Sequence, residues 1–137
     1  MEPHPQNNKS SELEAARAAA EACDQHHGRD IYLYDLKESS MLADFYLICT
    51  GTSEPHLKAL ADHIEERMAL FQRQPQHIDG SAASRWIVVD YGYLVIHLFM
   101  PAMRRYYELE NLWQDTAEII YASATEDGED DKPIPVF

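Results

Sequence analysis

Gly51-Thr52-Ser53 is the segment of this chain whose composition is best suited to binding phosphate. It stands between an apolar run and an amphipathic stretch, where backbone N–H groups at the start of a helix can point at an anion. Nucleotidyl transfer at such a turn also needs carboxylates on a following strand, because two or more of them must hold Mg²⁺ against the phosphates. The acids that follow, Asp62, Glu65 and Glu66, have helical spacing instead. We therefore expect a structural turn, with a nucleotide-binding or nucleotidyltransferase-type enzyme as the alternative function.

Histidine and cysteine gather near residue 25 without the spacing of a metal site. Cys23, His26 and His27 lie close together in sequence, but no second pair of ligands follows at the distance that a zinc site needs. Cys23 and Cys49 both stand in apolar patterns without a C-x-x-C pair, which is typical of small buried residues under reducing conditions. We predict no metal, no cofactor and no catalytic residue.

Aromatic residues concentrate in the second half of the chain and indicate a partner-binding surface, because Trp, Tyr and Arg often dominate the energetics of protein interfaces. Together with neighbouring polar residues, the candidates are Trp86, Asp90, Tyr91, Gly92, His97, Tyr106, Tyr107 and Trp113. Packing in the core is the alternative for the aromatic residues. Tyr91 lies in a predicted turn, so we expect it to be exposed.

Three of these candidates have an alternative specific to their position. Alternation along the strand predicted at 85–90 leaves open whether Trp86 or Ile87 faces inward. Asp90 beside a turn is favoured as a cap of backbone N–H groups, with an ion pair to a basic partner as the functional alternative. His97 stands within an apolar run, where a histidine satisfied within the fold is favoured over an interface hydrogen-bonding group.

The charge of the chain limits the partners that it can bind. With 24 acidic against 11 basic residues its formal net charge is −13, and without a dense Lys/Arg stripe it would be repelled by a phosphate backbone. Five acids and one lysine after residue 123 account for −4 of this charge and leave −9 for the remainder. A basic protein is therefore favoured over a nucleic acid as the partner, with solubility as the alternative reason for the charge.

Length and hydropathy favour one soluble, cytoplasmic domain. No apolar run approaches the roughly 20 residues that a membrane-spanning helix needs, and the first ten residues lack the basic start and apolar stretch of a secretory signal. A chain of 137 residues fits a single domain. We predict a disordered N-terminus at 1–10, an α/β domain at 11–122 and a disordered acidic tail at 123–137.

The elements that must position the candidate residues begin with a helix and two strands. A capping box of Ser11 and Glu14 predicts a helix at 13–25 that Gly28 ends. A short run at 31–34 alternates as a half-buried strand does. A nearly continuous apolar run follows at 45–49 and is typical of a central strand covered on both faces.

A second helix and a hairpin complete the predicted sheet. Ser53 is the expected N-cap of an amphipathic helix at 57–71, with Pro55 in its first turn. Two β-rich runs at 85–90 and 93–99 flank a turn that contains glycine, which predicts an antiparallel hairpin.

After the hairpin, a last helical segment with an apolar aromatic face is expected at 106–113. Two isoleucines at 119–120 can then pack back onto the sheet. From residue 123 the acids, a glycine and two prolines argue against a packed element.

Four motifs of this chain occur, in the same order, in the Iojap-type ribosomal silencing factors, which it resembles over roughly residues 11–115. The motifs are Asp44-Phe45 leading into Cys49-Thr50-Gly51-Thr52-Ser53, then Asp79-Gly80, then Arg85-Trp86-Ile87-Val88-Val89-Asp90-Tyr91-Gly92 with Val95-Ile96-His97-Leu98-Phe99, and finally Arg105-Tyr106-Tyr107-Glu108-Leu109-Glu110-Asn111-Leu112-Trp113. Two positions depart from the family pattern. Tyr93 stands where the family usually has an aspartate, and Gln114 stands where a glycine commonly precedes the aspartate.

The resemblance implies a single-domain α/β fold, with a mixed β-sheet and flanking helices similar to those of nucleotidyltransferases. It also implies binding to the large ribosomal subunit through ribosomal protein uL14, at the face that would otherwise meet the small subunit. Translation would then be repressed by steric exclusion alone, without catalysis. The acidic charge agrees with this role, because electrostatic complementarity to basic ribosomal proteins speeds and orients docking. A homodimer that overlaps the partner surface is a further hypothesis.

Overall fold

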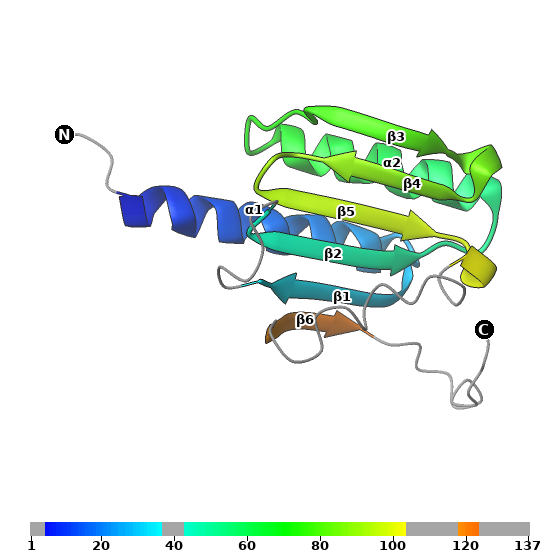
Figure 1. Cartoon of the computed structure of the whole chain (residues 1–137), viewed down its shortest axis with the longest axis horizontal. Coiled ribbons are helices and arrows are strands. Elements are labelled where there is room, and N and C mark those ends of the chain that lie inside the picture. The colour runs from blue at the N-terminus through cyan, green and yellow to red at the C-terminus, as the bar shows by residue number, and fades with distance from the viewer. Residues whose placement is uncertain (1–4, 37–42, 104–117, 124–137) are drawn as a thin grey trace.

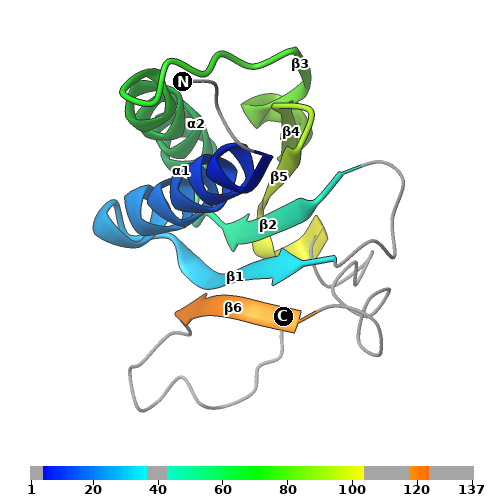
Figure 2. The same cartoon turned by 90° about the vertical axis from the view of Figure 1, so that its left-hand side faces the viewer.

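The computed structural model describes residues 5–36, 43–103 and 118–123, which form a six-stranded sheet with two helices packed on one of its faces (Figures 1 and 2). The helices are α1 (Pro5–Gln25) and α2 (Glu54–Ala69). The strands are β1 (Arg29–Asp35), β2 (Phe45–Thr50), β3 (His77–Ser81), β4 (Trp86–Asp90), β5 (Leu94–Phe99) and β6 (Glu118–Ser123), and a short 3-10 turn, η1 (Ala82–Ser84), precedes β4. This arrangement confirms the predicted single-domain α/β fold with a mixed sheet.

The sheet is mixed because its two central strands run parallel, while the other neighbouring pairs that the structure describes are antiparallel. The strand order is β3-β4-β5-β2-β1-β6, with β2 parallel to β5. The apolar run at 45–49 therefore lies in a central strand, as predicted, and the antiparallel hairpin of β4 and β5 is confirmed. A parallel pair needs a long crossover connection, and here α2, β3 and β4 supply it. The relation to nucleotidyltransferases stays a prediction.

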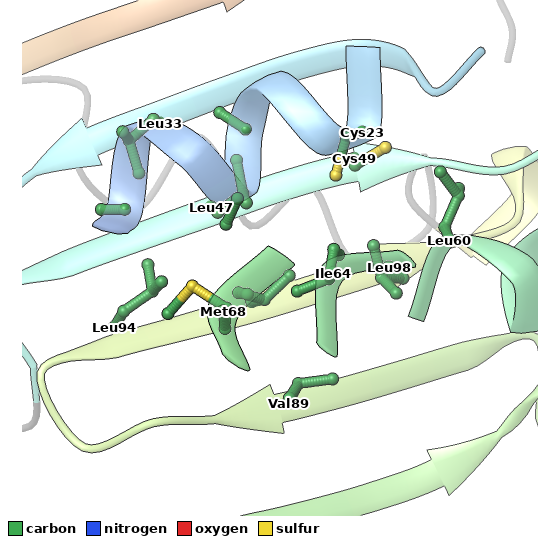
Figure 3. Packing of buried hydrophobic residues seen from close by; sticks show 14 of the residues in the cluster. Cys23, Leu33, Leu47, Cys49, Leu60, Ile64, Met68, Val89, Leu94 and Leu98 are labelled. Atoms are coloured by element: carbon green, nitrogen blue, oxygen red, sulfur yellow. The ribbon is translucent and has the colours of Figure 1, made fainter. Parts of the chain in front are cut away.

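The core between the sheet and the helices forms because side chains repeat every two residues along a strand and about every 3.6 residues along a helix. Every second strand residue faces the helices, so Leu33, Leu47 and Ile96 are all fully buried there. Helix α2 covers β4 and β5 with a stripe of apolar residues at helical spacing. The stripe consists of Leu57, Leu60, Ile64 and Met68, of which Figure 3 labels the last three.

Helix α1 packs on the same side through small residues. Its buried face consists of Ala15, Ala16, Ala19, Ala20, Ala22 and Cys23, and such short side chains let the helix backbone lie close to its neighbours. Cys23 and Cys49 of β2 are both fully buried beside each other in this core (Figure 3), as predicted for small apolar residues. A hydrogen bond with Cys49 and burial raise the pKa of the Cys23 thiol well above its ordinary value, so the thiol stays protonated and unreactive.

Helix α1 begins earlier than the sequence pattern predicts. Its first residue is Pro5, a residue type favoured at the first helical position, whereas the sequence pattern placed the start of the helix at residue 13. The disorder predicted for residues 1–10 stays a prediction. No glycine or further proline interrupts the chain from there to Gln25. Ser11 therefore lies inside the helix and does not cap it. The domain boundaries at 11 and 122 stay predictions.

The end of α1 is a Schellman motif. The Gly28 N–H donates to Cys23 O at 2.7 Å, and the His27 N–H donates to Asp24 O at 3.2 Å. His27, with φ of 67°, is the left-handed residue. Gly28 follows the helix end as predicted, but the position requires glycine for another reason, because a Cβ there would lie 2.5 Å from Cys49 Sγ.

Strand β6 forms one edge of the sheet beside β1 (Figure 1). Ile120 packs against the helix-side core, which confirms that this segment returns to the sheet, whereas Ile119 is 51% exposed. The helix predicted at 106–113 lies outside the described residues.

Candidate partner-binding site

Alternation along the strands gives the sheet a second face, which points away from α1 and α2 (Figure 2). On β4, Ile87 and Val89 enter the helix-side core, so Trp86 takes the opposite face and the question that the sequence left open is resolved. We call this second surface the aromatic face. Its residues are Tyr32, Tyr34, Tyr46, Ile48, Trp86, Val88, Asp90, Val95, His97 and Phe99.

Burial is graded across the aromatic face. Ile48 and Phe99 are fully buried, and His97 is only 8% exposed. Tyr46 and Trp86, on the strands to either side of β5, are half-buried and keep surface accessible to solvent. Ile48 and Phe99 therefore belong to a small second core inside the chain, and Tyr46 and Trp86 carry the solvent-accessible part of this face.

Aromatic neighbours and a hydrogen bond hold Trp86 in place. Its ring lies 5.0 Å from that of Phe99, its direct partner in the strand register, and 6.0 Å from that of His97. Trp86 Nε1–H donates to His97 Nδ1 at 3.2 Å. Tyr46, from the other neighbouring strand, stacks on His97 at 5.3 Å between ring centroids. The imidazole therefore lies between the two half-buried aromatic residues.

The imidazole of His97 is neutral and has a fixed tautomer. Burial lowers the pKa of His97 to about 4, so the ring carries one donor and one acceptor at neutral pH. Because Nδ1 accepts from Trp86, the proton lies on Nε2. Nε2 is buried without a hydrogen-bond partner in the described part of the chain. The sequence predicted that the fold satisfies both ring nitrogens of His97, and the structure shows a hydrogen bond for Nδ1 alone.

Asp90 and Gly92 form the turn between β4 and β5. Asp90 Oδ1 accepts the Gly92 N–H at 2.7 Å, which confirms the capping role of Asp90. Gly92 has φ of +91°, a conformation that favours glycine, and therefore serves the turn. Asp90 also belongs to the aromatic face, because alternation along β4 places it on the same side as Trp86 and it pairs with Val95 in the strand register. Burial, and after it the charge of Asp90, raises the pKa of Tyr46.

The prediction that Tyr91 is exposed is wrong. Tyr91 is 4% exposed and packs in the helix-side core, on the opposite side of the sheet from Trp86. The turn changes the direction of the chain, and burial raises the pKa of the Tyr91 phenol. Tyr93 packs against the same core, with the Arg73 guanidinium 5.1 Å above its ring. Tyr91 and Trp86 therefore do not belong to one surface.

The turn Gly51-Thr52-Ser53 uses its polar groups within the fold. The Gly51 N–H donates to Phe99 O at 2.8 Å, and the Thr52 N–H donates to His56 Nδ1 at 3.0 Å. Ser53 is the N-cap of α2, as predicted, and its Oγ accepts the His56 N–H at 3.1 Å. Glu54 adds a negative charge in the first helical turn, where it would oppose a phosphate. These contacts favour a structural turn over an anion site.

The histidines near the end of α1 do not converge with Cys23. The His26 ring stacks on that of His63 of α2, at 3.5 Å between centroids and 5° between planes. Burial and His63 lower the pKa of His26. Within residues 5–36, 43–103 and 118–123, no three His, Cys, Asp or Glu side chains gather as metal ligands. No helix in these ranges is long and apolar enough to cross a membrane.

Some predicted site residues cannot be placed, and some residues of the face were not predicted. Tyr106, Tyr107 and Trp113 lie outside the described residues. Tyr32 and Tyr46 were absent from the predicted site although both lie on the aromatic face. Alternation at 31–34 did place Tyr32 and Tyr34 on one side, but only the pairing of β1, β2 and β5 brings that side next to His97.

Comparisons with known proteins connect this fold to the ribosome. The model of a protein family described as ribosomal silencing factor during starvation matches residues 8–134. The ribosomal silencing factor RsfS of Bacillus subtilis is 37% identical over 99 residues, which cover 72% of this chain and 84% of the relative. A mouse protein named for mitochondrial assembly of the ribosomal large subunit is 34% identical over 92 residues, which cover 65% of this chain and 40% of the mouse protein. A crystal structure of a protein from Chromobacterium violaceum matches with a TM-score of 0.70 and 31% identity, covering 74% of this chain and 84% of that chain.

Proposed function

This chain belongs to the ribosomal silencing factor family, and we propose that it binds the large ribosomal subunit and represses translation by keeping the small subunit from joining. The contact on the ribosome is protein uL14, docked against the aromatic face of the sheet. Exclusion by the bound domain is the whole mechanism, so no bond is made or broken. The site of action is the cytoplasm, where the ribosomal subunits meet.

The observation that supports this proposal most strongly is the position of Trp86. It projects from the sheet face that α1 and α2 do not cover, stays half-buried, and is fixed by Phe99 and His97. Tryptophan is among the residues that most often dominate interface energetics. A rigid aromatic anchor loses little conformational freedom on docking, which favours its use in recognition.

Charge supports a basic partner for the same face. The chain carries a net charge of −13, and Asp90 lies at the turn end of the aromatic face. Opposite charges on two partners steer encounter and set the docking orientation. A basic ribosomal protein therefore fits this surface better than a nucleic acid, whose phosphates the domain would repel.

Cosedimentation with purified large subunits tests the proposal, followed by subunit joining in a sucrose gradient. We expect Trp86→Ala to weaken retention about thirtyfold, since loss of an interface anchor often costs about 2 kcal/mol. Leu70→Ala is the matched control, because Leu70 is a large apolar side chain that is 77% exposed at the end of α2, away from the aromatic face. Thermal unfolding of each variant separates lost binding from lost folding.

Two results would reject the proposal. One is a failure of large subunits to retain the unchanged chain, and the other is normal joining of small subunits in its presence. Purified uL14 in place of the subunit then distinguishes this partner from another ribosomal component. Sedimentation of the free chain shows whether two copies pair, in which case a homodimer over the aromatic face would compete with docking.

A further inference from the structure

The hydrogen bond between Trp86 and His97 joins the accessible anchor to a buried group. Trp86 is half-buried and His97 is 8% exposed, and the two side chains come from paired strands. Trp86 Nε1–H has one hydrogen to donate, and His97 Nδ1 accepts it at 3.2 Å. Contacts with Phe99 and Tyr46 confine the rings further. The orientation of the indole is therefore linked to the protonation state and position of one imidazole.

His97 is a poor choice for stability alone. Its Nε2–H is buried without an acceptor in the described part of the chain, and an unpaired buried donor destabilises a fold. A leucine at the same place would remove this donor and would suit the apolar neighbours Ile48 and Phe99. The benefit of the imidazole lies in its other nitrogen, which holds Trp86.

We propose that His97 is a positioning residue, whose Nδ1 holds the Trp86 indole in the orientation that the docking partner meets. This inference rests on the proposed function, because it assigns a role within the same surface. An anchor already fixed in the free protein avoids the loss of side-chain freedom on binding, which typically weakens affinity by roughly two- to tenfold for each ordered side chain. His97 contributes to affinity without itself meeting the partner.

Two substitutions at His97 separate the hydrogen bond from packing. His97→Leu removes the acceptor and also removes the unpaired donor. His97→Asn keeps an acceptor, because the amide oxygen branches from Cγ as Nδ1 does. We expect His97→Leu to bind large subunits roughly three- to tenfold more weakly, with a melting temperature equal to or above that of the unchanged chain. We expect His97→Asn to restore most of the binding.

The indole N–H resonance of Trp86 provides a readout that does not depend on the ribosome. The chain has two tryptophans, so Trp113→Phe assigns the signal. In His97→Leu the resonance should shift and its exchange with solvent should quicken, and His97→Asn should reverse part of both changes. A purely structural role predicts instead that His97→Leu lowers the melting temperature and that binding falls only as far as folding does.

The outcomes distinguish this inference from the proposed function. If the unchanged chain fails to bind large subunits, both are overturned. If it binds and Trp86→Ala does not, then equal binding by His97→Leu and the unchanged chain overturns the positioning role alone. Equal loss by His97→Leu and His97→Asn, with an unmoved indole resonance, also overturns it, because the acceptor at Nδ1 would then be irrelevant.

Discussion

Tyr121 donates a hydrogen bond of 2.8 Å from its hydroxyl to Asp24 Oδ2, which connects edge strand β6 to the last turn of α1. The two residues are 97 positions apart in sequence. Burial and the hydrogen bond with Asp24 raise the pKa of the Tyr121 phenol, so the hydroxyl stays protonated and available as the donor. This contact joins the last described strand to the helical layer.

We expect Tyr121→Phe to lower the free energy of unfolding by about 1 kcal/mol, because the bond is exposed to solvent and a typical hydrogen bond contributes about 0.5–1.5 kcal/mol. Urea unfolding measures the change. Asp24→Ala, alone and in the Tyr121→Phe background, is the control, since removal of the acceptor should add little once the donor is gone. Additive losses would show that the two side chains do not interact in solution.

His97 should make the stability of the fold depend on pH. Burial lowers its pKa from 6.5 to about 4, so between these values the unfolded chain binds more protons than the folded one. The contribution of His97 to the free energy of unfolding is therefore most favourable above pH 6.5 and falls as pH drops toward 4. We expect a loss of about 2 kcal/mol between pH 7 and pH 5 from this group. Urea unfolding of the unchanged chain and of His97→Leu at both pH values isolates the contribution of His97. An equal pH dependence of the two proteins would contradict the lowered pKa of His97.

Asp90→Asn should test the charge of the aromatic face without disturbing its turn. An asparagine Oδ1 can still accept the Gly92 N–H that Asp90 accepts at 2.7 Å, so the melting temperature should change little. Association with large subunits should slow several-fold at low salt, and the difference should shrink at high salt because screening weakens steering. A stopped-flow or surface-based association rate at two salt concentrations measures it. A salt-independent effect would argue against electrostatic steering.

Ser53→Ala should destabilise the protein by about 1 kcal/mol, because Ser53 Oγ accepts the His56 N–H at the start of α2. Ser53→Gly should cost only a few tenths of a kcal/mol, since glycine is tolerated at an N-cap.

Calorimetry with magnesium nucleotides tests the alternative function of the same turn. We expect no binding to the unchanged chain, and binding that Ser53→Ala abolishes would restore the nucleotide-binding alternative for this turn.

Gly28→Ala should destabilise the fold by about 1–3 kcal/mol, the usual range for forcing an atom into a packed core. A Cβ at this position would lie 2.5 Å from Cys49 Sγ and 2.9 Å from Cys23 O. Cys49→Ala removes the closer atom, so the combined variant should be more stable than the sum of the two single losses predicts. Thermal unfolding of the three variants decides, and strict additivity would mean that the two positions are not in contact.

The sequence by itself determined the elements whose cause is local. The continuous apolar run of β2, the N-cap at Ser53 and the glycine-containing turn of the β4–β5 hairpin all depend on residues a few positions apart, so a single sequence is enough to predict them. The start of α1 was missed for a local reason too. A good capping box at Ser11 competes with a helix that can simply continue, and nothing between Pro5 and Gln25 stops it.

Tertiary structure decided which side chains share a face. Trp86 and Tyr91 are five positions apart and looked like one aromatic cluster, yet the sheet places them on opposite sides. Tyr46 and His97 are 51 positions apart and lie in contact, because β2 and β5 pair in parallel with a fixed register. The pairing of strands far apart in sequence depends on which arrangement buries the apolar faces of the whole sheet, and neighbouring residues do not determine it. The motif could therefore be found from the residues alone, and the surface could not.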